Sequence, residues 1–260
     1  MSRDPRRAIL LSFDNLGEAA DLERGDERPA GDHPTVTTAL PRLLARLAEL
    51  DLRATFFVEA INTELYPQAV RDIAAAGHEV GMHAWRHERW DALERTGADE
   101  LLDRGLRAFA ALGIEVEGFR PPGGALGPHS AAALAARGLR WSSPAGTDAG
   151  RADGLVCLPF RWPLVDAYHR MEAFADLRVS LGDEARAASP RATADALLEA
   201  FDAADDGPLV VILHPFLMLA PEEVAEADRV LARIAELAAS GSRWVAPGRE
   251  IAAMLSSAPG

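Results

Sequence analysis

The sequence predicts an α/β fold in which a largely parallel sheet, covered by helices, curls into a closed or partly closed barrel of seven or eight strands. Short apolar runs alternate with helical patterns along all 260 residues, as in chains of βαβ units. Hydrophobic residues make up 48% of the chain, enough to bury a large core. No glycine-rich phosphate loop follows the first apolar run, which removes support for a nucleotide-binding fold. We expect one domain over residues 1–260.

Eight short apolar runs account for the expected strands. They are residues 8–13, 54–58, 78–83, 117–121, 139–143, 155–160, 209–214 and 243–247. Four segments between them have the apolar spacing of helices, and two of these open with a proline, which favours the first helical turn. They are residues 41–50, 99–112, 130–137 and 221–237. Two longer segments, 17–34 and 161–191, lack either pattern, and long loops in compact domains are often functional.

Composition narrows the classes of partner. The net charge of −13 argues against nucleic acid or an anionic membrane surface as the main partner. Cys157 is the single cysteine and lies in an apolar run, so we expect a core residue, no internal disulfide and a reducing compartment. No apolar stretch of about 18 residues is present, and the N-terminus lacks the pattern of a signal peptide. We therefore expect a cytoplasmic protein without a membrane span.

Polar residues follow several of the predicted strands directly. Asp14 and Asn15 follow the first, Arg120 ends the fourth before a Pro-Pro-Gly-Gly turn, and His214 ends the strongly apolar run 209–214. Taken singly, each suits a turn, a helix cap or a buried core position. The C-terminal ends of parallel strands, however, meet at one edge of a sheet or barrel, so these side chains should converge. A buried arginine there needs a carboxylate, and Asp14 is the candidate.

A pair of histidines follows the third predicted strand. His83 and His87 are four residues apart, a spacing that on a helical turn brings both imidazoles to one face, where they can share a metal ion. The alternative is an exposed pair without a common ligand. His78 lies within the strand and is expected to be structural, while Trp85 and Trp90 are expected to pack or to line a pocket.

The ordered set Asp-Asn, HxxxH, RPPGG and a late strand-His resembles the polysaccharide deacetylase family, the NodB-homology carbohydrate esterases. Residues 54–58 (ATFFV) and 77–83 (GHEVGMH) add to this resemblance, which covers about residues 8 to 250. It implies a distorted (β/α) barrel in one catalytic domain. It also implies hydrolysis of an N-acyl group, acetyl or formyl, from an amino sugar or related small amide, with a divalent metal ion, most simply zinc.

The resemblance also implies roles for individual residues. Asp14 corresponds to the catalytic base, Arg120 to the arginine that orients this base, and His214 to the acid that protonates the leaving amine. The metal ligands would be His83, His87 and Asn15. Four residues are expected to bind substrate: Pro121, Trp162, Asp166 and Tyr168. Asp148 is a candidate for the acidic residue that tunes His214.

Asn15 departs from the family pattern, which has a second aspartate at this position. A neutral amide oxygen attracts a cation less strongly than a carboxylate does. The site could adapt in three ways. Asp14 itself could ligate the metal, or a residue of the acidic loop that follows (Glu18, Asp21, Glu23 or His33) could do so. Alternatively, the site could work with a weakly bound metal or with none.

Asn15→Asp is therefore expected to raise metal occupancy, because it adds a negative charge next to the cation. Elemental analysis of both proteins after dialysis measures this. Equal and full occupancy of the two proteins would contradict it.

The same residues leave two alternatives to the deacylase. One is a hydrolase of cyclic amides or ureides of the allantoinase type, and the other is a degenerate member that binds sugar without turnover. The retention of a base, its arginine and an acid favours an enzyme, since binding alone needs none of these together. The expected partner is a small-molecule or lipid-linked amino sugar, and the sequence leaves homo-oligomer formation open.

Overall fold

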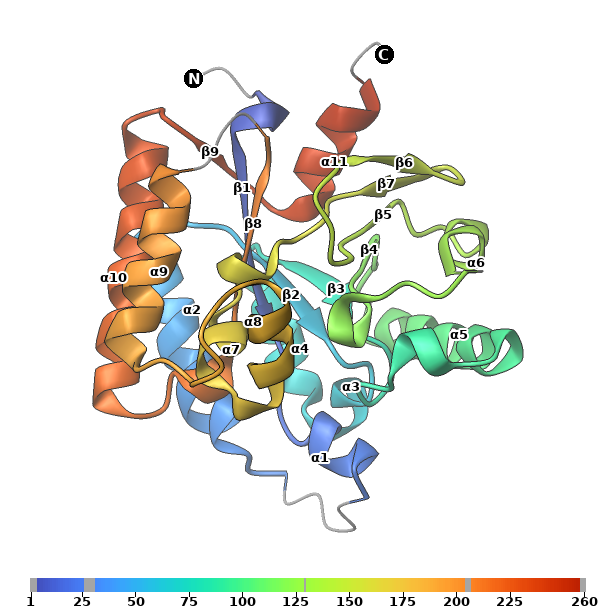
Figure 1. Cartoon of the computed structure of the whole chain (residues 1–260). Coiled ribbons are helices and arrows are strands. Elements are labelled where there is room, and N and C mark those ends of the chain that lie inside the picture. The colour runs from blue at the N-terminus through green and yellow to red at the C-terminus, as the bar shows by residue number, and fades with distance from the viewer. Residues whose placement is uncertain (1–3, 26–30, 129, 204–206, 258–260) are drawn as a thin grey trace.

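The structure is a computed structural model, and it describes residues 4–25, 31–128, 130–203 and 207–257. One twisted sheet runs through it (Figure 1). Its strands are β1 (Ala8–Asp14), β2 (Thr55–Val58), β3 (Glu79–Met82), β4 (Gly118–Phe119), β5 (Trp141–Ser142), β6 (Gly150–Ala152), β7 (Leu155–Cys157), β8 (Leu209–Leu213) and β9 (Trp244–Val245). The spatial order is β6-β7-β5-β4-β3-β2-β1-β8, and β9 pairs with the beginning of β1.

All of these pairings are parallel except that of β6 with β7. The chain that follows β7 carries the sheet round toward its opposite edge. Phe160 pairs with Ala145 beyond β5, and five residues later Val165 pairs with Ile212 of β8. The curled sheet is thus a distorted barrel, and the predicted fold class is confirmed.

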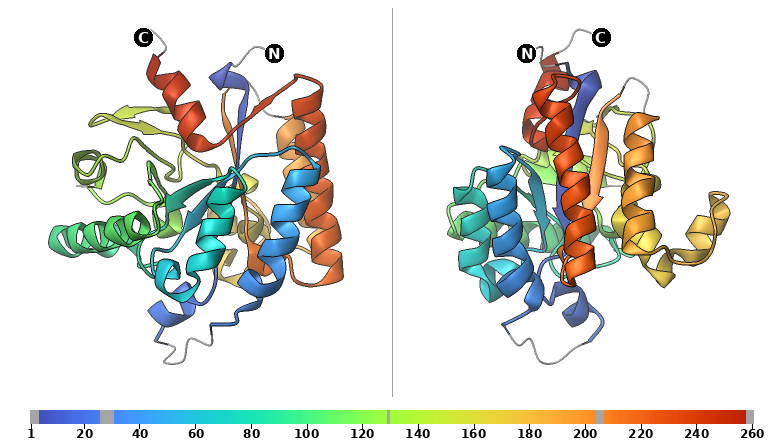
Figure 2. Two further views of the ribbon diagram at one scale, coloured as in Figure 1. Left: turned by 180° about the vertical axis from the view of Figure 1, so that it is seen from behind. Right: turned by 90° about the vertical axis from the view of Figure 1, so that its left-hand side faces the viewer.

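Helices surround this sheet. They are α1 (Ala19–Glu23), α2 (Leu40–Glu49), α3 (Asn62–Leu65), α4 (Pro67–Ala75), α5 (Arg95–Ala111), α6 (Ser130–Ala136), α7 (Asp166–Arg170), α8 (Ala175–Ser180), α9 (Pro190–Asp202), α10 (Pro221–Ala239) and α11 (Gly248–Ser257). The view from behind shows α2, α4, α5 and α10 packed against one face (Figure 2). In the part of the chain that the structure describes, no helix has the length and apolar character needed to cross a bilayer.

The first strand shows how the sequence positions the site. All seven residues of β1 are buried, as expected for a central parallel strand covered on both faces. Ile9, Leu11 and Phe13 belong to the apolar cluster under the outer helices, whereas Leu10 belongs to the cluster inside the barrel. Because side chains alternate along a strand, Asp14 lies on the same side as Leu10 and points into the barrel at its C-terminal mouth.

All eight predicted strands are present, and the structure adds β6, a short strand that apolar patterning does not reveal. The prediction that 161–191 is irregular was wrong, because it contains α7 and α8. Each of these helices has five or six residues, too few to show a helical period. Segment 17–34 contains α1, and its residues 26–30 lie outside the described part.

Candidate active site

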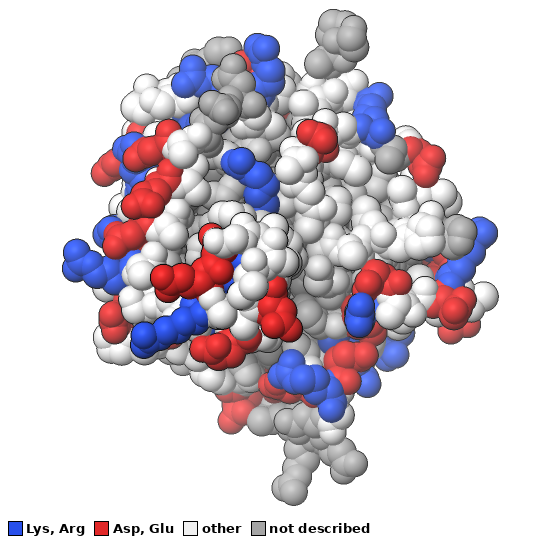
Figure 3. Space-filling model, viewed as in Figure 1, with Lys and Arg blue, Asp and Glu red and all other residues white. Residues whose placement is uncertain are grey.

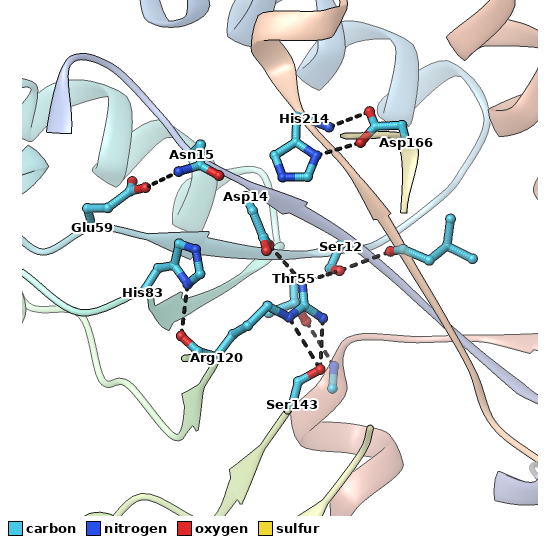
Figure 4. A network of polar contacts seen from close by, with 12 residues as sticks. Ser12, Asp14, Asn15, Thr55, Glu59, His83, Arg120, Ser143, Asp166 and His214 are labelled. Atoms are coloured by element: carbon cyan, nitrogen blue, oxygen red, sulfur yellow. Dashed lines mark hydrogen bonds and ion pairs between the residues drawn. The ribbon is translucent and has the colours of Figure 1, made fainter. Parts of the chain in front are cut away.

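A cavity of about 450 Å³ opens at the C-terminal ends of the strands. It brings together most of the residues singled out from the sequence: Asp14, Asn15, His83, His87, Arg120, Pro121, Trp162 and His214. These come from the ends of β1, β3, β4 and β8 and from the segment that bridges the barrel edges. Figure 4 shows several of them facing one another across the mouth. The cavity is thus the place where these strands deliver polar groups, as parallel barrels do.

Asp14 is held by a buried arginine. Arg120 Nη1 donates to Asp14 Oδ1 at 2.7 Å and to Ser12 Oγ at 2.7 Å. Ser143 Oγ accepts from Arg120 Nε and Nη2 at 3.3 and 2.9 Å, and the guanidinium lies 4.1 Å from the centre of the Phe57 ring. Burial lowers the pKa of Arg120, while the negative charge of Asp14 opposes this shift. The arginine therefore fixes the orientation of one carboxylate oxygen and compensates its charge.

Ser12 and Ser143 are functional residues that sequence reasoning missed. Both are buried and both position the guanidinium of Arg120. Ser12 Oγ also donates to the carbonyl oxygen of Val211 at 2.9 Å, which ties β1 to β8. The available signal was a polar residue at an inward-facing position of an otherwise apolar strand.

His83 and His87 present their rings to the same cavity. Their centroids lie 4.9 Å apart at an interplanar angle of 72°. His83 Nδ1 is 2.8 Å from the carbonyl oxygen of Arg120, which can only accept, so Nδ1 carries the hydrogen and Nε2 keeps its lone pair. Burial lowers the pKa of His83 to about 3, and burial with the neighbouring His83 lowers that of His87 to about 3. Both rings are therefore neutral, the form that binds metals.

The histidine pair lies on a turn after β3, and the expected helical turn is absent there. Ala84 and His87 have positive φ angles of 60° and 75°. Buried Glu88 holds this turn, because its carboxylate accepts from the backbone N–H groups of Trp85 at 2.9 Å and Arg86 at 2.9 and 3.0 Å. The two imidazoles, four residues apart in the sequence, are therefore brought together by a hydrogen-bonded turn instead of a helical one.

Asn15 lies beside the histidine pair, in the left-handed region with φ 62°, which asparagine tolerates better than most residues. Its Nδ2 donates to Glu59 Oε1 at 2.9 Å. Two imidazole nitrogens and one amide oxygen suit a borderline divalent cation in kind, but they bring no negative charge. Among the described residues, no group of three or more His, Cys, Asp and Glu side chains is arranged to hold a metal.

The acidic loop offers little replacement for the missing charge. Glu18 Oε1 accepts from Tyr66 Oη at 2.7 Å and from the Gly31 backbone N–H at 2.8 Å, so this carboxylate is engaged away from the histidines. Asp21 and His33 line the cavity, and Asp21 pairs with Arg24. Asp14 is held by Arg120. Asn15 therefore stays the predicted third ligand beside the histidine pair.

His214 is oriented by Asp166, which corrects two assignments from the sequence. His214 Nδ1 lies 2.5 Å from Asp166 Oδ1, and the His214 backbone N–H donates to Asp166 Oδ2 at 2.8 Å. Burial favours the neutral ring, but the charge and hydrogen bond of Asp166 outweigh it, so the pKa of His214 is raised. Asp148, predicted to tune this histidine, is exposed in the β5–β6 region. Asp166, predicted to bind substrate, acts on His214 instead.

The predicted substrate residues divide in two. Trp162 and Pro121 line the cavity, but Tyr168 does not, because it is buried and its hydroxyl donates to Asp183 Oδ2 at 2.5 Å. Apolar side chains that the sequence did not single out complete the wall with Trp162: Met171, Phe174 and Phe216. His78 is buried away from the cavity and accepts from the Ala54 backbone N–H at 3.2 Å.

Comparison with known proteins identifies the family of the chain. The model of the family described as "Polysaccharide deacetylase" matches residues 2–141. Chitin deacetylase 1 of Saccharomyces cerevisiae is 37% identical over 87 residues, which are 33% of this chain and 29% of that protein. The matched region thus spans less than a third of the length of this curated relative.

Solved structures extend the likeness to nearly the whole chain. A Mycobacterium smegmatis structure whose name places it among polysaccharide deacetylases has a TM-score of 0.79 and 25% identity, covering 99% of this chain and 93% of its own. The structure of Puue Allantoinase has a TM-score of 0.76 and 18% identity, covering 98% and 92%, and so shares the fold. The family match covers more than half of the sequence, and the protein therefore belongs to the polysaccharide deacetylase family.

Proposed function

We propose that this protein is a metal-dependent hydrolase that removes an N-acyl group, acetyl or formyl, from an amino sugar or related small amide. One observation carries the proposal: a carboxylate held by Arg120 and a histidine held by Asp166 face the same cavity as a neutral histidine pair. A base, an acid and a metal-binding pair in one cavity match the needs of amide hydrolysis, in which nitrogen leaves only when protonated.

The proposed reaction has two proton transfers, and a different residue carries out each of them. A divalent ion held by His83, His87 and Asn15 would supply Lewis acidity toward the acyl oxygen and toward water. Asp14 accepts the proton of the attacking water, and Arg120 orients its carboxylate. His214, whose pKa Asp166 raises, donates a proton to the leaving nitrogen. Each transfer thus has its own group, fixed by its own buried partner.

The cavity also supports a substrate of sugar size. Its volume of about 450 Å³ lies within the usual range for small-molecule sites. Trp162 and Phe174, whose ring centroids are 5.3 Å apart, form an apolar wall of the kind against which the C–H face of a pyranose packs. Acidic and basic side chains are interspersed over the face seen in Figure 3. We place the reaction in the cytoplasm, on a free or lipid-linked amino sugar.

A substrate panel tests this proposal. Zinc-loaded protein is expected to release acetate or formate from N-acyl amino sugars, and a chelator should abolish the release because the histidine pair needs a metal to act. Cyclic ureides and imides form the second arm of the panel. Turnover of that arm alone would replace the deacylase with an allantoinase-like hydrolase, and saturable sugar binding without turnover would indicate a non-catalytic member.

Asp166→Asn is expected to move the alkaline limb of the pH–rate profile to lower pH. His214 works as an acid, so activity falls as pH rises through its pKa. Asp166 raises that pKa, and removing its charge lowers it. The measurement is kcat against pH, with Asp148→Asn as the control because Asp148 is exposed and acidic. An unchanged alkaline limb in Asp166→Asn would contradict the role of the pair.

A further inference from the structure

Glu59 is a fully buried carboxylate at the edge of the cavity, and nothing in the chemistry above uses it. It directly follows β2, and β2 pairs with β1 so that Asp14 lies opposite Phe57. Residues 15 and 59 therefore both lie just past the ends of adjacent parallel strands. Figure 4 shows Asn15 lying between Glu59 and the cavity.

Three N–H donors converge on this carboxylate. Asn15 Nδ2 donates to Oε1 at 2.9 Å, and the Leu16 backbone N–H donates to Oε2 at 3.2 Å. Asn62 Nδ2 makes a longer contact of 3.4 Å to Oε2. A side chain surrounded by donors in this way acts as an acceptor toward each of them. Glu59 therefore takes the nitrogen end of the Asn15 amide.

This contact decides which end of the amide faces the metal-binding histidines. An asparagine side chain has one oxygen and one nitrogen end, and only the oxygen can ligate a cation. With its nitrogen bonded to Glu59, Asn15 turns its oxygen away from Glu59 and toward the cavity, as Figure 4 shows. The acceptor that orients the Asn15 amide is thus supplied by Glu59, the partner of position 15.

We propose that Glu59 is a positioning residue of the metal site, which presents the oxygen of Asn15 to the cation, and that residues 15 and 59 form a matched pair. The inference rests on the proposed function. It predicts that the two positions are coupled: a carboxylate at 15 gains most from a donor at 59, just as the amide at 15 needs an acceptor at 59.

Glu59→Gln tests whether the amide at position 15 needs an acceptor at position 59. Glutamine has one acceptor oxygen, and the fixed Leu16 N–H claims it, so the new amide nitrogen faces Asn15 and reverses the Asn15 side chain. Zinc affinity is expected to fall by about 10- to 100-fold, the usual effect of removing a residue that orients a metal ligand. In the Glu59→Gln background, Asn15→Asp should then restore or exceed the wild-type affinity, since the introduced glutamine donates to the introduced aspartate.

The test is a double-mutant cycle of Asn15→Asp and Glu59→Gln, with zinc affinity measured by competition with a chelator and thermal stability measured on metal-free protein. The inference predicts that Asn15→Asp tightens zinc binding at least tenfold more in the Glu59→Gln background than in the wild-type background. It also predicts non-additive changes in melting temperature without metal. If Glu59→Gln alone fails to fold, the double variant is compared with Asn15→Asp, and the inference then predicts tighter zinc binding by the double variant; equal or weaker binding would contradict it.

Glu79→Gln is the matched control. Glu79 is also buried, and its carboxylate accepts from Thr55 Oγ1 at 2.8 Å, Trp141 Nε1 at 3.0 Å and the Arg249 backbone N–H at 2.9 Å. It begins β3, at the strand end opposite the cavity. Its replacement should lower stability and leave zinc affinity unchanged.

Two outcomes would overturn the inference. Burial raises the pKa of Glu59 to about 8, and a protonated Glu59 can donate a hydrogen bond to an aspartate at position 15. Asn15→Asp would then raise zinc affinity equally in both backgrounds. Such a result would contradict a matched pair. In that case zinc-dependent turnover would leave the proposed function intact. Failure of every variant to bind zinc would instead overturn the metal requirement together with this inference, while coupled melting temperatures would still report the contact.

Discussion

Replacement of Asp14 by asparagine is expected to lower the rate of amide hydrolysis by about 10²- to 10⁴-fold, the usual contribution of a positioned general base. It should also destabilise the fold by about 3–5 kcal/mol, since a buried charge left without its partner is costly. Arg120 is 1% exposed, and Asp14 is its carboxylate partner at 2.7 Å. The measurements are product release and urea unfolding of the variant and the wild type.

Two controls separate the catalytic effect from the structural one. Asp14→Asn combined with Arg120→Met removes both charges and should recover much of the stability, because an apolar group then occupies the buried space, but it should not recover activity. Asp228→Asn breaks a partly exposed pair with Arg46 and should change stability by less than about 1 kcal/mol. An Asp14→Asn protein with the wild-type rate would remove Asp14 from the chemistry.

His214→Gln is expected to lower kcat on unactivated amides by about 10²- to 10⁴-fold, because the leaving nitrogen then lacks its proton donor. The effect should depend on the leaving group. An aryl ester or an activated anilide leaves without full protonation, so its hydrolysis should fall much less. The measurement compares kcat for the amide and the activated substrate in both proteins. Equal losses on both would indicate that His214 serves binding or structure instead of proton transfer.

Much of the fold and the centre of the site follow from the sequence. The eight apolar runs became strands because a parallel sheet covered on both faces needs continuous apolar segments. Asp14, Arg120 and His214 could be located because polar residues at the ends of such strands have one common place in a barrel. The closeness of His83 and His87 was also predictable from their spacing, although a bonded turn produces it.

The remaining parts depend on contacts between distant segments. Asp166 lies on a five-residue helix, and only the bridge between Val165 and Ile212 brings it to His214. Tyr168, two residues later, therefore points away from the cavity. Glu59 looks like an ordinary residue after an apolar run, and its significance appears only when β1 and β2 are paired. Short helices and cross-strand partners of this kind leave no periodic signal.

The most direct test of the account is anomalous diffraction at the zinc edge from crystals of the zinc-loaded protein. The account predicts one strong peak in the cavity at a bonding distance of about 2.0–2.1 Å from a ring nitrogen of both His83 and His87, with the oxygen of Asn15 turned toward it. The His83→Ala protein should lose this peak. A cavity without the peak, or zinc bound at another place with turnover intact, would contradict a metal-assisted site built on Asn15 and the histidine pair.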